Sequence, residues 1–280
     1  MFFLILAILC GSMLALMIRL SEGRVKSKTS MLAVNYVTCT LLCGIYMGFD
    51  LSLNMQGSGR TLLLGVITGV FYVVSLLLMQ VSIRQNGVIL PSVFSRLGGL
   101  LVPLVVAICF FGEKPSLLQV IGAVIAAFSI VAITSGGKRT AITSVTSLLL
   151  ILLSDGIATA MSSVYEQLGR VELSTQFLFY TFGTALLICL ALIIRNKEGF
   201  GWKELLFGLC IGVPNFFASR CLLQALQTIS PVIAYPTRGV ASLLVITLAG
   251  VVFFRERLHK RQWAAIAAIL VAVLLLNMKI

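Results

Sequence analysis

Long apolar runs follow one another along the whole chain, separated by short polar segments. A helix needs roughly 20 apolar residues to cross a bilayer, and the runs have about that length. None of them shows the alternation over about ten residues that marks a transmembrane β-strand. The pattern therefore predicts an all-α, polytopic membrane protein. Its ten transmembrane helices are expected at residues 2–20, 30–49, 61–82, 88–111, 117–135, 145–165, 174–194, 204–227, 231–254 and 261–278.

Composition supports this fold class. Hydrophobic residues make up 59% of the 280 residues and charged residues 11%, whereas soluble domains carry about 25% charged residues. Most of the protein surface must therefore face lipid. The first apolar run has no basic segment before it and no small-residue cleavage pattern after it, which predicts a retained helix rather than a signal peptide. We expect a multi-pass protein of the cytoplasmic membrane of the cell.

The chain repeats itself at an offset of 143 residues, since residues 110–119 read FFGEKPSLLQ and residues 253–262 read FFRERLHKRQ. The same offset aligns Gly65 with Gly208, Gly69 with Gly212, and Leu100 with Leu243. Internal duplication is a common way to build transporters. The duplication predicts a first five-helix repeat at 1–136, an inter-repeat loop at 137–144 and a second five-helix repeat at 145–280.

Lysine and arginine are distributed unevenly between the two sides of the predicted bundle. One side carries fourteen of them: Arg19, Arg24, Lys26, Lys28, Arg84, Lys138, Arg139, Arg195, Lys197, Lys203, Arg255, Arg257, Lys260 and Arg261. The other side carries four: Arg60, Lys114, Arg170 and Lys279. Basic residues concentrate on the cytoplasmic side of membrane proteins, so both termini are expected outside the cytoplasm. The net charge of +12 thus reflects topology and does not indicate a nucleic-acid partner.

The repeats are predicted to be inverted. Five helices per repeat is an odd number, so the second repeat must insert upside down relative to the first. Equivalent loops of the two repeats should then carry opposite charge bias, and the basic residues above follow that pattern. Inverted repeats place a substrate site near the bilayer midplane and allow alternating access by rocking.

Each half closes with an apolar run, a Glu-Lys or Glu-Arg turn, a Gln and a final apolar helix. In these features the chain resembles the drug/metabolite transporter (DMT) superfamily of EamA type, over essentially its whole length. The matching residues are Glu113, Lys114, Gln119, Gly122, Glu256, Arg257 and Gln262. The resemblance implies a carrier of amino acids, drugs or other metabolites, and export rather than uptake. It also implies cytoplasmic termini, and on this point we follow the charge count instead.

The glutamates of the repeated motif have a structural interpretation. Ser116 and Gln119 form a capping-box pattern at the start of the fifth predicted helix, with Ser116 as N-cap and Gln119 at N3. Glu113 and Glu256 stand just before the fifth and tenth helices, where a negative charge is favourable. We interpret both glutamates as interfacial helix-end residues rather than as ligands of a coupling ion.

Three arginines lie inside predicted helices: Arg96 in the fourth, Arg220 in the eighth and Arg238 in the ninth. A charge at the bilayer centre costs about 2.5–3.5 kcal/mol, so each guanidinium needs a partner, water or a route to the interface. Asp155, in the sixth helix, is the one carboxylate at comparable depth. It is a candidate for binding a proton or cation or a substrate amine, and equally for a structural ion pair with Arg220 or Arg238.

Asp155 also begins a polar stripe on one helical face, together with Thr159, Ser162 and Glu166. Further polar residues of the third, eighth and ninth helices are predicted to line the same central cavity, whereas the four repeat-matched glycines are predicted to serve close helix packing. The predicted substrate-binding residues are Arg96, Arg220, Arg238, Asp155, Tyr72, Asn215, Gln224 and Tyr235. We expect no catalytic residue, no metal site and no cofactor.

Among the function classes, a secondary carrier accounts for the inverted duplication and the intramembrane arginines. We see no enzyme constellation, nucleotide-binding motif or selectivity filter. Arginine recognises carboxylate and phosphate bidentately, which favours export of a small polar metabolite bearing such a group, for example an amino acid. The alternatives are efflux of lipophilic cations or drugs bound against Asp155, and a non-transporting receptor or scaffold. The expected partners are a small-molecule substrate, a candidate coupling proton and the lipid bilayer, for a monomer or homodimer.

Overall fold

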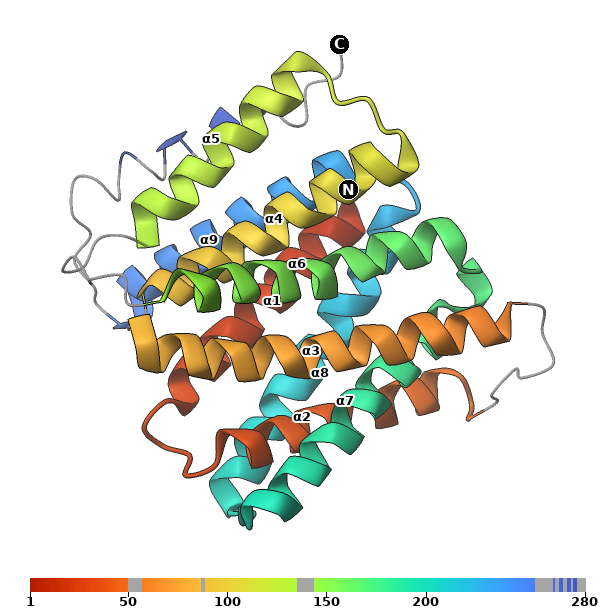
Figure 1. The fold of residues 1–280 in the computed structure, drawn as a ribbon, viewed down its shortest axis with the longest axis vertical. Coiled ribbons are helices and arrows are strands. Elements are labelled where there is room, and N and C mark those ends of the chain that lie inside the picture. Colours follow the sequence, from red (N-terminus) through yellow and green to blue (C-terminus); the bar gives the residue numbers. More distant parts are fainter. Residues whose placement is uncertain are drawn as a thin grey trace. The chain divides into compact units, whose positions relative to one another are not determined.

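The computed structural model describes residues 1–49, 57–86, 89–134 and 144–254, and near the C-terminus positions 264, 267, 268, 271, 272, 274 and 275. All regular structure within this part of the chain is helical. The elements are α1 (Phe2–Ser21), α2 (Lys28–Tyr46), α3 (Ser58–Asn86), α4 (Ile89–Phe111), α5 (Leu117–Thr134), α6 (Val145–Leu168), the short η1 (Val171–Leu173), α7 (Ser174–Asn196), α8 (Trp202–Leu226) and α9 (Pro231–Phe254) (Figure 1).

Among the described residues, eight helices are long and apolar enough to cross a bilayer, and α5 adds the shorter apolar stretch Leu117–Ala132. The predicted all-α membrane fold is therefore confirmed. The tenth predicted helix, 261–278, falls mostly outside the described residues, so the count of ten stays a prediction. Glu256, Arg257 and Gln262 of the repeat motif also lie outside them.

Two helices differ from their predicted bounds for identifiable reasons. α2 ends at Tyr46 rather than at 49 because Gly48 (φ +62°) and Phe49 (φ +56°) take left-handed backbone conformations. α3 has 29 residues and exceeds the predicted 61–82 at both ends. At 1.5 Å per residue it is about 43 Å long, more than the roughly 30 Å hydrocarbon core. The apolar pattern marked the part of α3 that fits in lipid, whereas the helix continues into polar sequence.

The predicted capping box at the start of α5 is confirmed. The backbone N–H of Ser116 donates to Gln119 Oε1 at 2.9 Å, and the backbone N–H of Gln119 donates to Ser116 Oγ at 3.3 Å. Glu113 accepts a hydrogen bond from the hydroxyl of Ser230, which precedes α9. The helix end that Glu113 contacts is thus the start of α9, although the sequence placed it at the start of α5.

The helices form two compact units. Unit 1 comprises Met1–Val73 and Val164–Ala225, and unit 2 comprises Val74–Ser163 and Leu226–Ile280. Each unit takes segments from both predicted repeats, and α3 and α6 contribute to both units. The compact units therefore differ from the sequence repeats. Unit 1 contains α2 and α7, the second helices of the two predicted repeats, and unit 2 contains α4 and α9, their fourth helices.

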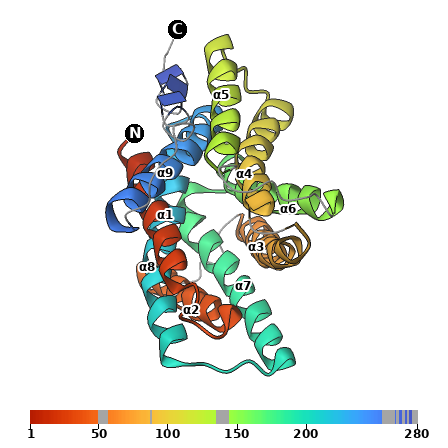
Figure 2. The same cartoon turned by 90° about the vertical axis from the view of Figure 1, so that its left-hand side faces the viewer.

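Unit 1 is organised around α2 and α7, which lie side by side (Figures 1 and 2). Its core is rich in aromatic rings: Tyr36 stacks on Phe182 at 6.3 Å between ring centroids, and Tyr165 stacks on Phe177 at 4.1 Å. All four rings are buried. Burial of such large side chains is the main source of stability in this unit.

The repeat-matched glycines act in unit 1 as packing residues, as predicted. A Cβ at Gly208 on α8 would lie 2.5 Å from Val34 Cβ of α2, and one at Gly65 on α3 would lie 2.7 Å from Tyr180 Cβ of α7. Glycine thus allows the backbones to approach closely. In the first of these contacts the glycine, Gly208, belongs to the second repeat and its neighbour Val34 to the first. In the other, Gly65 belongs to the first repeat and its neighbour Tyr180 to the second. Such an exchange of roles is expected of inverted repeats. Superposition of the two halves stays a prediction.

Unit 2 is organised around α4 and α9, with α5 against both. Its core is aliphatic and contains Leu100 on α4, Val240 and Leu243 on α9, and Ala126 and Ile130 on α5. Leu100 and Leu243 are a matched pair of the repeat, so equivalent positions meet in this core.

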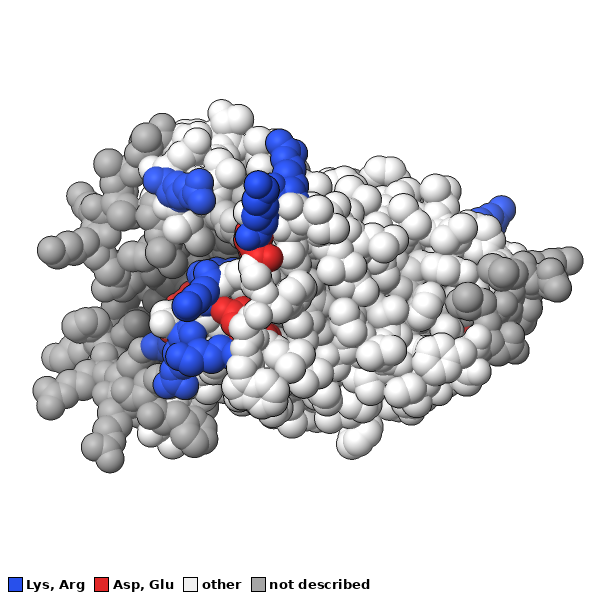
Figure 3. Space-filling model, turned by 90° about the horizontal axis from the view of Figure 1, so that it is seen from below, with Lys and Arg blue, Asp and Glu red and all other residues white. Residues whose placement is uncertain are grey.

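Unit 1 places most of its basic residues at one end. The backbone N–H groups of Lys26 and Ser27 donate to Glu204 Oε1 at 2.6 and 3.3 Å, and Ser30 Oγ donates to the Gly199 carbonyl at 2.9 Å. These bonds join the α1–α2 loop to the α7–α8 loop, as required if both face the same side of the membrane. Figure 3, seen from the side on which α2 and α7 lie in Figure 1, shows Lys and Arg gathered mainly at one end of the visible face.

Candidate functional site

The eight residues predicted to bind substrate divide equally between the two units. Asp155, Arg96, Arg238 and Tyr235 belong to unit 2, whereas Arg220, Tyr72, Asn215 and Gln224 belong to unit 1. The single cavity predicted to hold all eight stays a prediction.

Asp155 is the centre of the polar residues in unit 2. Its Oδ1 accepts a hydrogen bond from the hydroxyl of Ser75 on α3, and its Oδ2 accepts one from the hydroxyl of Ser95 on α4, both at 2.8 Å. Each carboxylate oxygen thus has a donor from a different helix. Hydrogen bonds to an ionised group are stronger than those between neutral groups, so this carboxylate joins α3, α4 and α6.

Close approach of α4 and α6 makes this geometry possible. A Cβ at Gly98 would collide with the backbone carbonyl of Leu152, and a Cβ at Gly156 would collide with the side chain of Val102. Gly99 follows on the same helix, and a Cβ there would lie 3.9 Å from Asp155 Oδ2. The glycines therefore bring α4 up to α6 and leave the carboxylate uncovered by side chains at this position.

Two arginines belong to the same unit as Asp155, Arg96 on α4 and Arg238 on α9, close enough for a favourable electrostatic interaction with its carboxylate. Both guanidinium groups are half-buried. One carboxylate and two guanidiniums leave one positive charge uncompensated among these three side chains. We call Asp155, Arg96, Arg238, Ser75 and Ser95 the Asp155 cluster.

Tyr235 adds a contact between α9 and α6 beside this cluster. Its ring is fully buried, and its hydroxyl donates to the backbone carbonyl of Thr159 at 3.2 Å. Thr159 Oγ1 in turn donates to the backbone carbonyl of Asp155 at 2.8 Å. Tyr235 is therefore linked to the backbone that carries Asp155, three helical positions from Arg238.

Arg220 has a different environment in unit 1. Its Nη1 donates to Thr175 Oγ1 at 2.5 Å, and its guanidinium carbon lies 3.8 Å from the centre of the Tyr46 ring. Thr175 begins α7 and Tyr46 ends α2, so Arg220 ties three helices together near their ends. A hydroxyl and an aromatic face stabilise this guanidinium. The pairing of Arg220 with Asp155 that the sequence left open stays a prediction, because the two residues belong to different units.

Asn215 and its partner form a second polar contact in unit 1. The Asn215 amide donates to Asn35 Oδ1 at 3.1 Å, joining α8 to α2 one residue after the helix-interior Pro214. Tyr72 packs against Phe182 with ring centroids 6.4 Å apart, and Gln224 is half-buried on α8. Three of the four predicted residues of unit 1 therefore have contacts that hold its helices together.

The sequence did not reveal the partners that decide these environments. Tyr46 and Thr175 stand at helix ends and carry no charge, so nothing in the pattern marked them as neighbours of Arg220. Gly98 and Gly156 were also missed, although glycines inside two apolar helices are the available signal for a close crossing.

Comparison with known proteins agrees with this architecture. The sequence profile of the EamA-like transporter family matches residues 145–278. A probable 4-amino-4-deoxy-L-arabinose-phosphoundecaprenol flippase subunit, ArnE, of Pseudomonas syringae pv. syringae is 36% identical over 96 residues, which cover 31% of this chain and 88% of that protein. The chain belongs to the EamA-like transporter family.

Two broader similarities cover almost the whole EamA-like chain. An uncharacterized protein of Haemophilus influenzae is 22% identical over 284 residues, covering 96% of this chain and 95% of that protein. A solved crystal structure has the same fold, with a TM-score of 0.76 at 17% identity, over 99% of this chain and 95% of the other. These two similarities concern the fold. Membership of the EamA-like family makes the protein a multi-pass transporter of the cell membrane, with a small molecule as its substrate.

Proposed function

We propose that this EamA-like protein is a secondary transporter that exports a small polar solute bearing a carboxylate or phosphate group. The observation that supports this most directly is the Asp155 cluster, in which Ser75 and Ser95 hold the carboxylate of Asp155 and two arginines, Arg96 and Arg238, stand on the packed helices α4 and α9 of the same unit. The remaining positive charge is complementary to an anionic group. Placing an arginine at membrane depth costs free energy unless the charge has such a partner. The planar guanidinium can donate two parallel hydrogen bonds to a carboxylate or phosphate.

The roles within the cluster follow from the hydrogen bonds. Ser75 and Ser95 hold the carboxylate of Asp155, so Asp155 balances one guanidinium while the other meets the solute. Tyr235 positions α9 against α6 through Thr159. Tyr72, Asn215 and Gln224 stay predicted substrate contacts of unit 1. For Arg220, also predicted to bind substrate, the contacts with Thr175 and Tyr46 favour a structural role.

A second candidate is transport of a lipid-linked solute. It is favoured by the similarity to the probable flippase subunit of Pseudomonas syringae, whose named substrate combines a phosphate with an amino sugar. The phosphate of such a substrate would use the same arginines. A lipophilic-cation carrier would instead depend on Asp155 as its binding group.

A proteoliposome assay separates these candidates. Amino acids, sugar phosphates, a polyprenyl-linked sugar phosphate and lipophilic cations are offered in parallel, under an imposed proton gradient and without one. We expect movement of an anion-bearing solute and its loss in Arg238→Ala. Transport of lipophilic cations alone would discard the proposal, and transport unaffected by the proton gradient would exclude a coupling proton.

The double variant Arg238→Ala with Asp155→Asn tests whether Arg238 binds substrate or only balances Asp155. If Arg238 binds the anionic group, the double variant stays as inactive as Arg238→Ala. Recovery of transport in the double variant would move both residues to a purely structural role.

Orientation is proposed from the basic residues, with both termini outside the cytoplasm. In unit 1 the end that joins the α1–α2 and α7–α8 loops carries Arg19, Arg24, Lys26, Lys28, Arg195, Lys197 and Lys203, and the other end carries Arg60 and Arg170. A C-terminal reporter that fluoresces only in the cytoplasm should therefore stay dark. Bright cells would reverse the assignment.

A further inference from the structure

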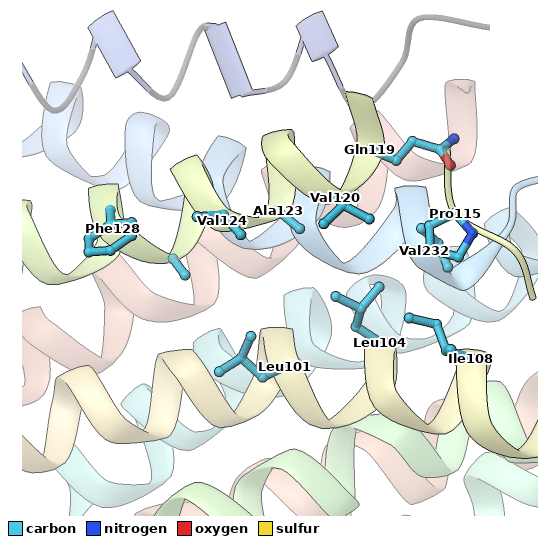
Figure 4. A pocket seen from close by; sticks show the side chains of 11 residues that line it. Leu101, Leu104, Ile108, Pro115, Gln119, Val120, Ala123, Val124, Phe128 and Val232 are labelled. Atoms are coloured by element: carbon cyan, nitrogen blue, oxygen red, sulfur yellow. The ribbon is translucent and has the colours of Figure 1, made fainter. Parts of the chain in front are cut away.

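In unit 2 a groove of about 320 Å³ lies between α4 and α5 (Figure 4). From α4 it is lined by Leu101, Leu104 and Ile108, which share one helical face. From α5 it is lined by Ala123 and Ala127, with Phe128 at one end. The two alanines of α5 are too small to fill the space opposite the larger side chains of α4, so the groove between the two helices stays open.

The groove is suited to an apolar occupant. In the close-up, apolar side chains from both helices face one another across it, and the amide of Gln119 is at one end (Figure 4). Because Gln119 Oε1 already accepts the Ser116 N–H, it serves the helix cap. Phe128 is 73% exposed, and in a bilayer such a side chain faces hydrocarbon. A water molecule in the groove would lack the two to four polar partners that it needs.

The length of the groove matches one leaflet. From Val120 to Phe128 the lining of α5 spans eight residues, which corresponds to about 12 Å along a helix. The hydrocarbon part of one leaflet is about 15 Å thick, half of the roughly 30 Å core. The groove begins at Pro115 and Gln119, at the start of α5, so it runs inward from the membrane interface.

A lysine stands at the interfacial end. Lys114 directly precedes Pro115 and is exposed, while the neighbouring carboxylate of Glu113 accepts the Ser230 hydroxyl. A lysine at the membrane surface attracts anionic lipid headgroups. Its long apolar stem also allows the ammonium to reach the headgroup layer.

We propose that the groove binds one hydrocarbon chain of an anionic membrane phospholipid, with the headgroup beside Lys114. The bound chain fills the space between α4 and α5 and holds α5 against unit 2. This site is separate from the Asp155 cluster, and it does not depend on the identity of the transported solute.

Photo-crosslinking tests the position of the chain. The full-length protein is reconstituted with phosphatidylglycerol that carries a diazirine in its acyl chain, irradiated and digested. We expect the label at positions 123–128 of α5 and 101–108 of α4. The matched control position is Ile121, which is exposed on α5 but outside the groove. Label at Ile121 equal to that at Ala123 and Ala127 would overturn the proposal.

Filling the groove provides a second measurement. Ala123→Phe with Ala127→Phe should remove the groove label, whereas Ile121→Phe should keep it. The mapping on the unaltered protein decides the question if the filled variant does not fold. In a Val124→Cys variant that also carries Cys109→Ser and Cys210→Ser, copper phenanthroline is added as the oxidant. A disulfide-linked product of twice the chain mass, formed in place of lipid labelling and absent without Val124→Cys, would identify a second copy as the occupant and overturn the lipid proposal.

The headgroup is tested by comparing phosphatidylglycerol with phosphatidylcholine. Lys114→Gln should reduce the preference for the anionic lipid about fivefold, the factor expected for one lysine near a membrane surface. Arg60→Gln, a change of charge outside the groove, should leave the preference unchanged. An unchanged preference in Lys114→Gln would overturn the assignment of the headgroup.

Discussion

The buried polar side chains of the two compact units have different kinds of partner. Unit 1 satisfies its polar groups with neutral partners: Arg220 lies against a threonine hydroxyl and a tyrosine ring, and Asn215 bonds to Asn35. Unit 2 instead concentrates charge, with two guanidiniums acting on the one carboxylate of Asp155. A charge at membrane depth is costly, so the partners of each guanidinium matter, and these partners are neutral in unit 1 and include a carboxylate in unit 2.

The hydrophobic cores of the two units also differ. Unit 1 buries stacked aromatic rings of α2, α6 and α7, whereas the cluster between α4, α5 and α9 in unit 2 consists of smaller aliphatic side chains, with the buried ring of Tyr235 elsewhere on α9. Larger buried side chains contribute more to stability than smaller ones. The comparison is consistent with the proposal above, in which unit 2 recognises the anionic group and the described contacts of unit 1 mainly stabilise its helices.

The largest effect is expected from removing the central charge of unit 2. Asp155→Asn keeps the shape of the side chain but leaves Arg96 and Arg238 without their counter-ion. Loss of one partner of a buried charge pair costs about 2–5 kcal/mol, so we expect transport to fall about 100-fold. Transport is measured in proteoliposomes at equal protein content. Glu172→Gln, which removes an exposed carboxylate of unit 1, should retain activity, and a comparable loss there would remove the contrast between the units.

The close helix crossings of both units are tested by adding a single methyl group. Gly98→Ala should lower the thermal stability of unit 2 by about 1–3 kcal/mol, because the new methyl overlaps the Leu152 carbonyl. Gly212→Ala should do the same in unit 1, where the methyl would lie 2.5 Å from Thr38 Cβ. Thermal unfolding in detergent measures both changes.

Matched controls exist in both units, since a Cβ at Gly239 in α9 or Gly183 in α7 meets nothing within 4 Å. Gly239→Ala and Gly183→Ala should therefore leave the stability unchanged or raise it slightly, as alanine favours helix. If the control variants lost as much stability as the test variants, the close helix crossings at Gly98 and Gly212 would not be the cause of the loss.

Exchanging Arg238 of unit 2 and Arg220 of unit 1 for lysine tests whether the two arginines have different roles. Arg238→Lys keeps the charge but loses the planar fork, so substrate affinity should fall about tenfold at normal expression. Arg220→Lys should leave the affinity nearly unchanged and instead lower thermal stability by about 1 kcal/mol through the lost contact with Tyr46. Binding titration and thermal unfolding of both variants separate the two roles. The reverse pattern would place the anion site in unit 1.

The smallest effect is expected for the amide pair of unit 1. Asn35→Ala and Asn215→Ala should each reduce stability by about 0.6 kcal/mol, the average measured for hydrogen bonds between membrane helices. Because the two amides share one bond, the double variant should lose little more than either single variant. Fully additive losses would indicate that the amides act independently and that the bond does not join α2 to α8.

The sequence alone determined the membrane class, the approximate places of nine helices, the capping box at Ser116 and the family. These follow from local properties: the length of an apolar run, the spacing of a serine and a glutamine, and a motif repeated at 143 residues. The intramembrane charges were also visible, because a charge in an apolar run stands out whatever its neighbours are.

Only the tertiary structure decided how those charges are partnered. The sequence listed Arg96, Arg220 and Arg238 as equals, yet Arg220 is held by Thr175 and Tyr46, whereas the other two act on Asp155. The structure also showed that each compact unit combines segments of both repeats. Such pairings depend on which helices cross and how closely, and a crossing such as that of Gly98 with α6 is set by distances in space that periodicity along one helix does not contain.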